Sequence, residues 1–136
     1  MEANPDPELT AQVAAAAPFT AFLGVEMVSA SPHEVIARLA WSEDKCTTGG
    51  VLHGGALMGL ADNVGGFCAF LNLPEGAAGT ATIESKTNFF AAVREGHVRA
   101  ESRPLHTGRR TIVVDTELYD DAGKLVARVT QTQAVL

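Results

Sequence analysis

The chain has 136 residues, of which 46% are hydrophobic and 19% charged, and its formal net charge is −6. These values predict one compact globular domain over residues 1–136 and exclude a disordered or fibrous chain. The ten lysines and arginines are scattered, and only Arg109 and Arg110 are adjacent, so the sequence offers no basic stripe for nucleic acid.

The cysteines and the start of the chain indicate a cytoplasmic protein. Cys46 and Cys68 stand far apart without metal-ligand spacing, so we expect free thiols in a reducing compartment and no metal site. The opening residues are acidic and interrupted by prolines, unlike the basic start of an export signal. The most apolar stretch, Ala56 to Leu73, is broken by Asp62 and several glycines, and we expect a buried helix there, not a membrane span.

The first half of the chain predicts a short helix, a strand pair and one long helix. Apolar residues recur at helical spacing from Pro7 to about Phe22. Rough alternation of apolar residues over 24–30 and 34–41 predicts two paired strands. A loop without periodicity then leads into an apolar helix from Gly54 to Leu71.

The second half predicts an antiparallel meander. Its four β-like runs are Thr80 to Ala92, Val98 to Leu105, Thr111 to Tyr119 and Leu125 to Val135. Turn signals separate them, the strongest being Asp-Asp-Ala-Gly at 120–123. A helix that is apolar on all sides must be covered on all sides, and a curved sheet wrapped around it would do so. The predicted fold class is therefore α+β, an antiparallel sheet around one central helix.

Asp62 is the one acidic residue within the long apolar helix. A carboxylate in such a place is either held by hydrogen bonds or faces a functional site, because an uncompensated buried charge is costly or shifts its pKa. No cationic residue lies one helical turn away to pair with it, which favours a functional site. A purely structural, hydrogen-bonded role is the alternative.

Gly54 and Gly55 open the same helix, where unpaired N–H groups can stabilise an oxyanion. The alternative is that they only permit a tight turn into the helix. Asp62 follows Gly54 by eight residues, roughly 12 Å along a helix axis, so one chain cannot bring both to one carbonyl. Two chains with antiparallel helices can, which predicts a homodimer. The assembly is either this dimer or a dimer of dimers.

Residues 53–66, His-Gly-Gly-Ala-Leu-Met-Gly-Leu-Ala-Asp-Asn-Val-Gly-Gly, resemble the helix signature of the hotdog-fold thioesterases, in particular the phenylacetate-pathway type. The likeness extends through 80–90 and 105–109, and the N-terminal helix matches loosely. The resemblance implies an acyl-CoA thioesterase that needs no cofactor. In it, Asp62 acts as general base or nucleophile and the Gly54 amide of the partner subunit polarises the thioester carbonyl.

The resemblance also implies supporting residues. Thr82 matches a Ser or Thr that helps hold the attacking water, and His53 matches a residue that shapes the turn. Thr47 departs from the pattern, because relatives carry an Asn or Gln there that contacts the substrate. The residues assigned to substrate binding are Thr47, Gly55, Asn63, Gly108, Arg109 and Arg110. The two arginines match a turn near the nucleotide end of CoA, where guanidinium groups suit phosphate oxygens, although a solvated hairpin tip is the alternative. Asn63 either orients the neighbouring carboxylate or serves packing.

The leading hypothesis is hydrolysis of a small or medium acyl-CoA, including aryl-acyl groups, with the acyl group between two helices against residues such as Leu57, Met58 and Phe67. The Gly-x-Ser-x-Gly elbow of serine hydrolases is absent from the sequence, which leaves the carboxylate route. A hotdog dehydratase or hydratase, with His53 as its histidine, is one alternative. A non-catalytic acyl-CoA-binding oligomer, with Asp62 as a structural group, is another.

Overall fold

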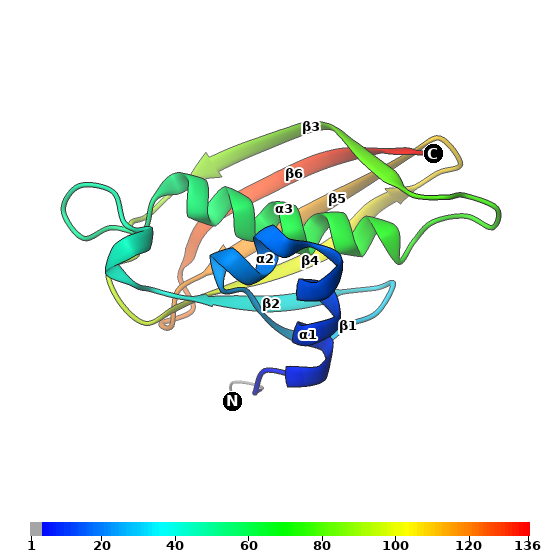
Figure 1. The fold of residues 1–136 in the computed structure, drawn as a ribbon. Coiled ribbons are helices and arrows are strands. Elements are labelled where there is room, and N and C mark those ends of the chain that lie inside the picture. Colours follow the sequence, from blue (N-terminus) through cyan, green and yellow to red (C-terminus); the bar gives the residue numbers. More distant parts are fainter. Residues whose placement is uncertain (1–3) are drawn as a thin grey trace.

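A computed structural model describes residues 4–136 of the chain. In this part, helices pack on one face of a six-stranded antiparallel sheet (Figure 1). The helices are α1 (Pro7–Ala16), α2 (Pro18–Leu23) and α3 (Gly54–Phe70), and the short 3-10 turn η1 (Glu43–Lys45) precedes α3. The strands are β1 (Glu26–Ala30), β2 (Val35–Ala40), β3 (Thr80–Phe89), β4 (His97–Thr107), β5 (Thr111–Tyr119) and β6 (Leu125–Val135). Residues 1–3, part of the acidic start weighed against an export signal, lie outside the described residues.

The sheet has the order β1-β2-β4-β5-β6-β3, and every neighbouring pair is antiparallel. β1 and β3 therefore form its two edges, and α3 lies across the face between them (Figure 1). The predicted α+β class and central helix are confirmed, and the predicted strands 111–119 and 125–135 have the observed bounds. The strand predicted from Thr80 to Ala92 ends at Phe89 in the structure.

The core lies between α3 and the sheet. Strand residues of alternating position face the helix, as in β4, where Val98, Ala100 and Ser102 are buried. The buried residues of α3 are Ala56, Leu57, Leu60, Ala61, Val64, Gly65, Cys68 and Ala69. Many of these are small, which lets the helix lie close to the strands. Cys46 and Cys68 are free thiols, as predicted.

The N-terminal segment forms two helices, and the prediction of one helix from Pro7 to about Phe22 was wrong. Pro18 divides the segment, because a proline disfavours helical backbone at the preceding residue and has no amide hydrogen. Ala17 accordingly has φ −132° and ψ 92°, an extended conformation. Pro18 instead begins α2 as a favourable first helical residue.

A single chain leaves one side of α3 uncovered, contrary to the prediction that its own sheet would cover every side. The sheet covers one side, and α2 packs near Gly59, where an added methyl group would lie 3.1 Å from Leu23 Cδ2. Met58, Asp62 and Phe70, which share a stripe at four-residue spacing, remain exposed. The uncovered stripe is where the candidate acid lies.

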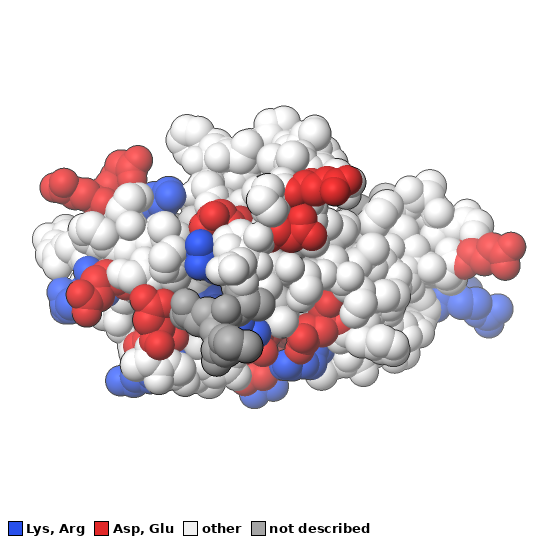
Figure 2. Space-filling view, turned by 90° about the horizontal axis from the view of Figure 1, so that it is seen from below, with Lys and Arg blue, Asp and Glu red and all other residues white. Residues whose placement is uncertain are grey.

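The surface carries charges of both signs. On the face shown in Figure 2, acidic and basic side chains are interspersed and neither sign gathers into one large patch. Elsewhere in the described residues, charged side chains form ion pairs across neighbouring strands, such as Arg128 with Asp115 at 2.6 Å. Among residues 4–136, no helix is both long enough and apolar enough to cross a bilayer.

Candidate active site

Asp62 lies midway along α3 on the wall of a groove between α1 and α3. The groove has a volume of about 380 Å³ and is lined by Leu9, Gln12, Val13, Ala16, Ala17, Asp62, Asn63, Gly66, Phe67 and Phe70. Asp62 is the one charged residue among them. Its side chain is partly open to solvent, and desolvation by the surrounding atoms raises the pKa of its carboxyl group.

None of the ion pairs among residues 4–136 includes Asp62. A carboxylate with a raised pKa and no cationic partner, at the side of an apolar groove, has the chemistry of a general base or nucleophile. Of the three residues expected against an acyl group, Phe67 lines this groove. Leu57 lies in the core with 3% of its surface exposed, and Met58 is exposed outside the groove.

The first turn of α3 has one amide without an acceptor in the described chain. Gly55 N donates to the His53 side chain, and the amides of Ala56 and Leu57 donate to the His53 carbonyl oxygen. Gly54 N, the remaining amide of the turn, donates to no atom of residues 4–136. The amide predicted to meet an oxyanion is thus the one left available, while that of Gly55 is engaged.

His53 is the N-cap of α3, and its Nδ1 accepts the Gly55 amide at 2.8 Å. A neutral imidazole whose Nδ1 accepts a hydrogen bond carries its proton on Nε2. Nε2 is then a donor and not a base. A methyl group at position 55 would lie 2.8 Å from Nδ1, so the cap also requires a glycine there.

Phe89, at the end of β3, lies directly against the start of α3, and sequence reasoning missed it. A methyl group added at Gly54 would lie 3.1 Å from Phe89 Cζ. Half of the Phe89 surface is nevertheless exposed. The available signal was a pair of aromatic residues, Phe89 and Phe90, at the end of an otherwise polar strand.

Asn63 fastens α2 to α3. Its Nδ2 donates to the Gly59 carbonyl at 2.9 Å, and its Oδ1 accepts from the hydroxyl of buried Thr20. Among the hydrogen bonds of residues 4–136, none joins Asn63 to Asp62. Thr47 is exposed in the loop that leads into α3, where its backbone N–H donates to Val51 O at 2.8 Å.

Thr82, on edge strand β3, is hydrogen-bonded to a buried side chain of the neighbouring strand β6. Its Oγ1 accepts a hydrogen bond from Gln133 Nε2 at 2.7 Å. Gln133 and its neighbour Gln131 are buried polar residues on β6, and both face α3. Sequence reasoning missed these glutamines; their signal was two amides at alternate positions in a strand that is otherwise suited to the core.

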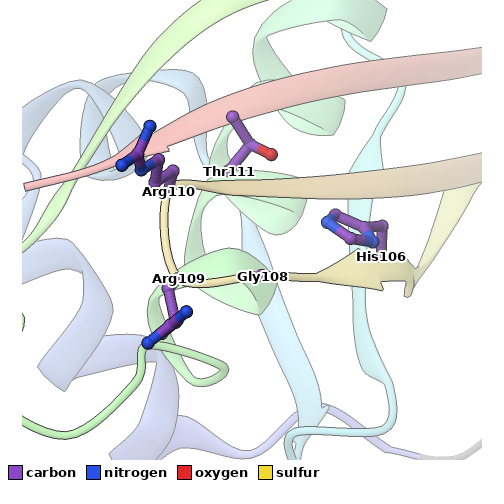
Figure 3. Close-up of a pocket in the computed structure, with 5 residues that line it drawn as sticks. All are labelled: His106, Gly108, Arg109, Arg110 and Thr111. Atoms are coloured by element: carbon purple, nitrogen blue, oxygen red, sulfur yellow. The ribbon is translucent and has the colours of Figure 1, made fainter.

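The hairpin between β4 and β5 lines an open hollow of about 590 Å³, formed with His106 and Thr111. Figure 3 shows that the side chains of Arg109 and Arg110 leave the turn in different directions. Gly108 has little free space, because an added methyl group would lie 2.7 Å from His106 Nε2 and 3.0 Å from Thr111 O. The two guanidinium groups therefore flank the hollow separately and do not converge on one point.

Residues 49–127, more than half of the chain, match the family model of the thioesterase superfamily. The 1,4-dihydroxy-2-naphthoyl-CoA hydrolase of Escherichia coli is 37% identical over 87 residues, which are 64% of this chain and 63% of that protein. A mutant of thioesterase PA1618 from Pseudomonas aeruginosa superposes with a TM-score of 0.86 at 27% identity, covering 98% of this chain and 95% of that one. A mutant of the phenylacetic acid degradation protein PaaI from Thermus thermophilus superposes with a TM-score of 0.80 at 27% identity, covering 88% and 99%.

The fold and these matches define the class as that of the hotdog thioesterases. The chain belongs to the thioesterase superfamily, as the resemblance of residues 53–66 indicated. It spans less than two thirds of the E. coli hydrolase, but nearly the full length of the two solved structures.

Proposed function

We propose that the chain hydrolyses acyl-CoA thioesters to free acid and CoA, with Asp62 as general base or nucleophile. The observation that carries this is the position of Asp62, a carboxylate with raised pKa and no ion-pair partner among residues 4–136, on the wall of an apolar groove of about 380 Å³. Such a groove suits a small or medium acyl group. The names of the naphthoyl-CoA hydrolase and PaaI support aromatic acyl groups within this range.

Both roles of Asp62 give a balanced reaction. As a base, the carboxylate takes a proton from water, whose oxygen bonds to the thioester carbon; the C–S bond then breaks, and the CoA thiolate takes up the proton. As a nucleophile, a carboxylate oxygen forms a mixed anhydride and expels CoA thiolate, and water then hydrolyses the anhydride. In either case the carbonyl oxygen becomes an oxyanion and needs a donor.

The donor in this proposal is the Gly54 amide of a second copy of the chain, since that amide is available and lies two helical turns from Asp62 of its own chain. β3 supports such a homodimer. It pairs with β6 on one side and is an edge strand, and Ile83 within it and Phe90 directly after it have 63% and 57% of their surfaces accessible. A two-fold axis at this edge would set two α3 helices antiparallel and complete two equivalent sites, in a dimer or in a dimer of dimers.

The hairpin that carries Arg109 and Arg110 is the proposed contact for the nucleotide end of CoA. Because its guanidinium groups lie on different sides of the turn, each would bind a separate phosphate group. The His106 ring lines the same hollow and offers a further polar contact. A cytoplasmic location is part of the same proposal and is compatible with a CoA ester as substrate.

The test is release of free thiol from a panel of acyl-CoA esters, from acetyl to decanoyl and including phenylacetyl and benzoyl esters. We expect Asp62→Ala to lose at least about a hundredfold in kcat while its circular dichroism stays unchanged. An unchanged rate in this variant would remove Asp62 from the mechanism. Thioester binding without thiol release by the wild-type chain would instead identify a binding protein.

The dehydratase alternative is disfavoured by the position of His53. Its Nδ1 is engaged by the Gly55 amide, so its free nitrogen donates and cannot abstract a proton in the neutral ring. The same panel, extended to 3-hydroxyacyl-CoA and enoyl-CoA and followed by absorbance of the enoyl group, separates the two reactions.

A further inference from the structure

A chain of buried amide groups connects α3 to Thr82 beneath the proposed site. Gln131 and Gln133 have 0% and 2% of their surfaces exposed. Gln131 Nε2 donates to the backbone carbonyl of Ala61, directly before Asp62, at 3.3 Å. Gln133 Nε2 donates both to Gln131 Oε1 and to Thr82 Oγ1. The chain therefore runs from α3 through β6 to the edge strand β3.

Gly65 makes this connection possible. A methyl group at Gly65 would overlap the Gln131 carboxamide, with Cδ at 2.9 Å, and would lie 3.2 Å from Thr116 Oγ1. Buried polar groups are costly unless they are hydrogen-bonded. Four such side chains beneath one helix, Gln131, Gln133, Thr116 and Ser102, are therefore a feature that apolar packing alone does not explain.

The Ala61 carbonyl, at one end of this hydrogen-bonded network, fixes the direction of each hydrogen bond that connects it to Thr82. The carbonyl of Ala61 can only accept, so Gln131 turns its NH₂ group toward it and its Oε1 toward Gln133. Gln133 must then present its NH₂ group, whose second hydrogen is donated to Thr82 Oγ1. Thr82 accepts on its inner side, and its own hydroxyl hydrogen is left to donate outward.

The β3 backbone beside Thr82 contains a β-bulge. Thr82 lies opposite Gln133 in the β3–β6 ladder, and the register shifts between Thr82 and Glu84, which leaves Ile83 as an extra residue. Such a bulge re-aims the side chains beside it and is frequent next to active sites. Thr82 is exposed to solvent, although its Oγ1 accepts a hydrogen bond from the buried Gln133.

We propose that Gln133, anchored through Gln131 to α3 beside Asp62, is a positioning residue that makes Thr82 an obligatory hydrogen-bond donor to the attacking water. Water that accepts from Thr82 keeps one lone pair for the thioester carbon and one proton for Asp62. Because the anchor is the Ala61 carbonyl, the donor is also held in register with the helix segment that carries the acid. This inference rests on the proposed thioesterase activity.

The test compares Gln133→Met, Thr82→Val and the double variant, with Thr116→Val as the matched control. Thr116 faces α3 from the same sheet and shares a 2.6 Å hydrogen bond with Ser102, so its loss leaves a comparable buried hydroxyl unpaired. We expect Gln133→Met and Thr82→Val each to lower kcat about tenfold with little change in KM, and the double variant to be no worse than either. Thr82→Ser should keep near wild-type kcat, and Thr116→Val should lower the melting temperature without lowering kcat.

Additive losses in the double variant, a wild-type kcat in Gln133→Met, or an equal loss in Thr116→Val would each overturn the proposal. Failure of the thioesterase assignment is recognisable separately, because it would appear as no Asp62-dependent thiol release. In that case coupling between positions 82 and 133 remains measurable as non-additive changes in the free energy of unfolding. Additive changes in the free energy of unfolding would show that Gln133 and Thr82 are not coupled.

Discussion

The middle and the start of α3 carry the two halves of the proposed site, and they are built in different ways. Around Asp62, a single chain supplies a groove wall from α1 and an environment that raises the pKa of the carboxyl group. Around Gly54, one chain supplies an available amide and the ring of Phe89, and nothing among residues 4–136 accepts the amide hydrogen.

The comparison shows that the two proposed catalytic groups on α3, a side-chain carboxyl group and a backbone amide, depend on different parts of the structure. The acid depends on the identity of one side chain and on the helices that cover the groove. The oxyanion donor is a backbone N–H at the start of the helix, and its role depends on the second copy of the chain that is proposed to lie opposite it. Substitutions at the two positions should therefore fail for different reasons, and they should complement each other only across subunits.

Gly54→Pro should give the largest loss among the changes at the helix start. Proline removes the amide hydrogen, yet it suits the first helical position, and His53 already has the extended backbone, φ −60° and ψ 135°, that a following proline requires. Gly54→Ala is the control, because it adds the same Cβ against Phe89 and keeps the N–H. We expect kcat of the proline variant to lie at least about a hundredfold below that of the alanine variant. Equal rates would exclude Gly54 N as the oxyanion donor.

Mixing subunits sharpens the same comparison. If each site combines Asp62 of one chain with Gly54 of the other, a dimer of one Asp62→Ala chain and one Gly54→Pro chain has one intact site. Random reassociation of equal amounts of the two inactive variants should restore roughly a quarter of wild-type activity, half of the dimers being mixed and half of their sites intact. If the two residues instead act within one chain, the mixture stays inactive.

Much of the fold was predictable from sequence because its signals are local. Alternating residues and the Asp-Asp-Ala-Gly turn defined the meander, and the Gly-Gly start and uniform apolar character defined α3. Pro18 carried a clear signal for the break between α1 and α2, and the Ala-rich pattern concealed it. Asp62 could be singled out because a lone acid in an apolar helix contradicts its surroundings.

The rest depended on contacts between distant segments. The groove exists because residues of α1 and α3 line it together, and no residue spacing within either helix encodes that arrangement. The hydrogen bonds that join Gln131 and Gln133 to α3 and to Thr82 span two strands and a helix, and they link residues 70 and 51 positions apart in the sequence. Asn63 illustrates the same limit, since its partner Thr20 lies 43 residues away on α2.

A substitution at Gly66 tests whether the groove beside Asp62 receives the acyl group. Gly66 lines the groove, and an added Cβ would meet no atom within 4 Å, so a larger side chain can project into it without disturbing the core. We expect Gly66→Leu to reduce kcat/KM about tenfold for octanoyl-CoA and less than about twofold for acetyl-CoA, because about one extra side chain of apolar volume is removed from the groove. A uniform loss over all acyl lengths would place the acyl group elsewhere.

Replacing Asp62 by Asn removes the proposed base or nucleophile, but its effect on stability should be the smallest change predicted here. Desolvation raises the folded-state pKa of Asp62 above its unfolded value, so folding favours the protonated carboxyl group. That contribution is fully present below the unfolded pKa and is lost as the pH rises through the folded pKa. At pH 7 the ionised group therefore lowers stability, and a neutral asparagine relieves this cost. Because the side chain is partly exposed, we expect a rise of only about 2 °C in the melting temperature at pH 7, shrinking as the pH falls toward 4.

Asp115→Asn, which breaks the 2.6 Å ion pair with Arg128, is the control and should instead lower the melting temperature. A lower melting temperature for Asp62→Asn at pH 7 would mean that the fold stabilises the ionised carboxylate, as the structural alternative for Asp62 requires.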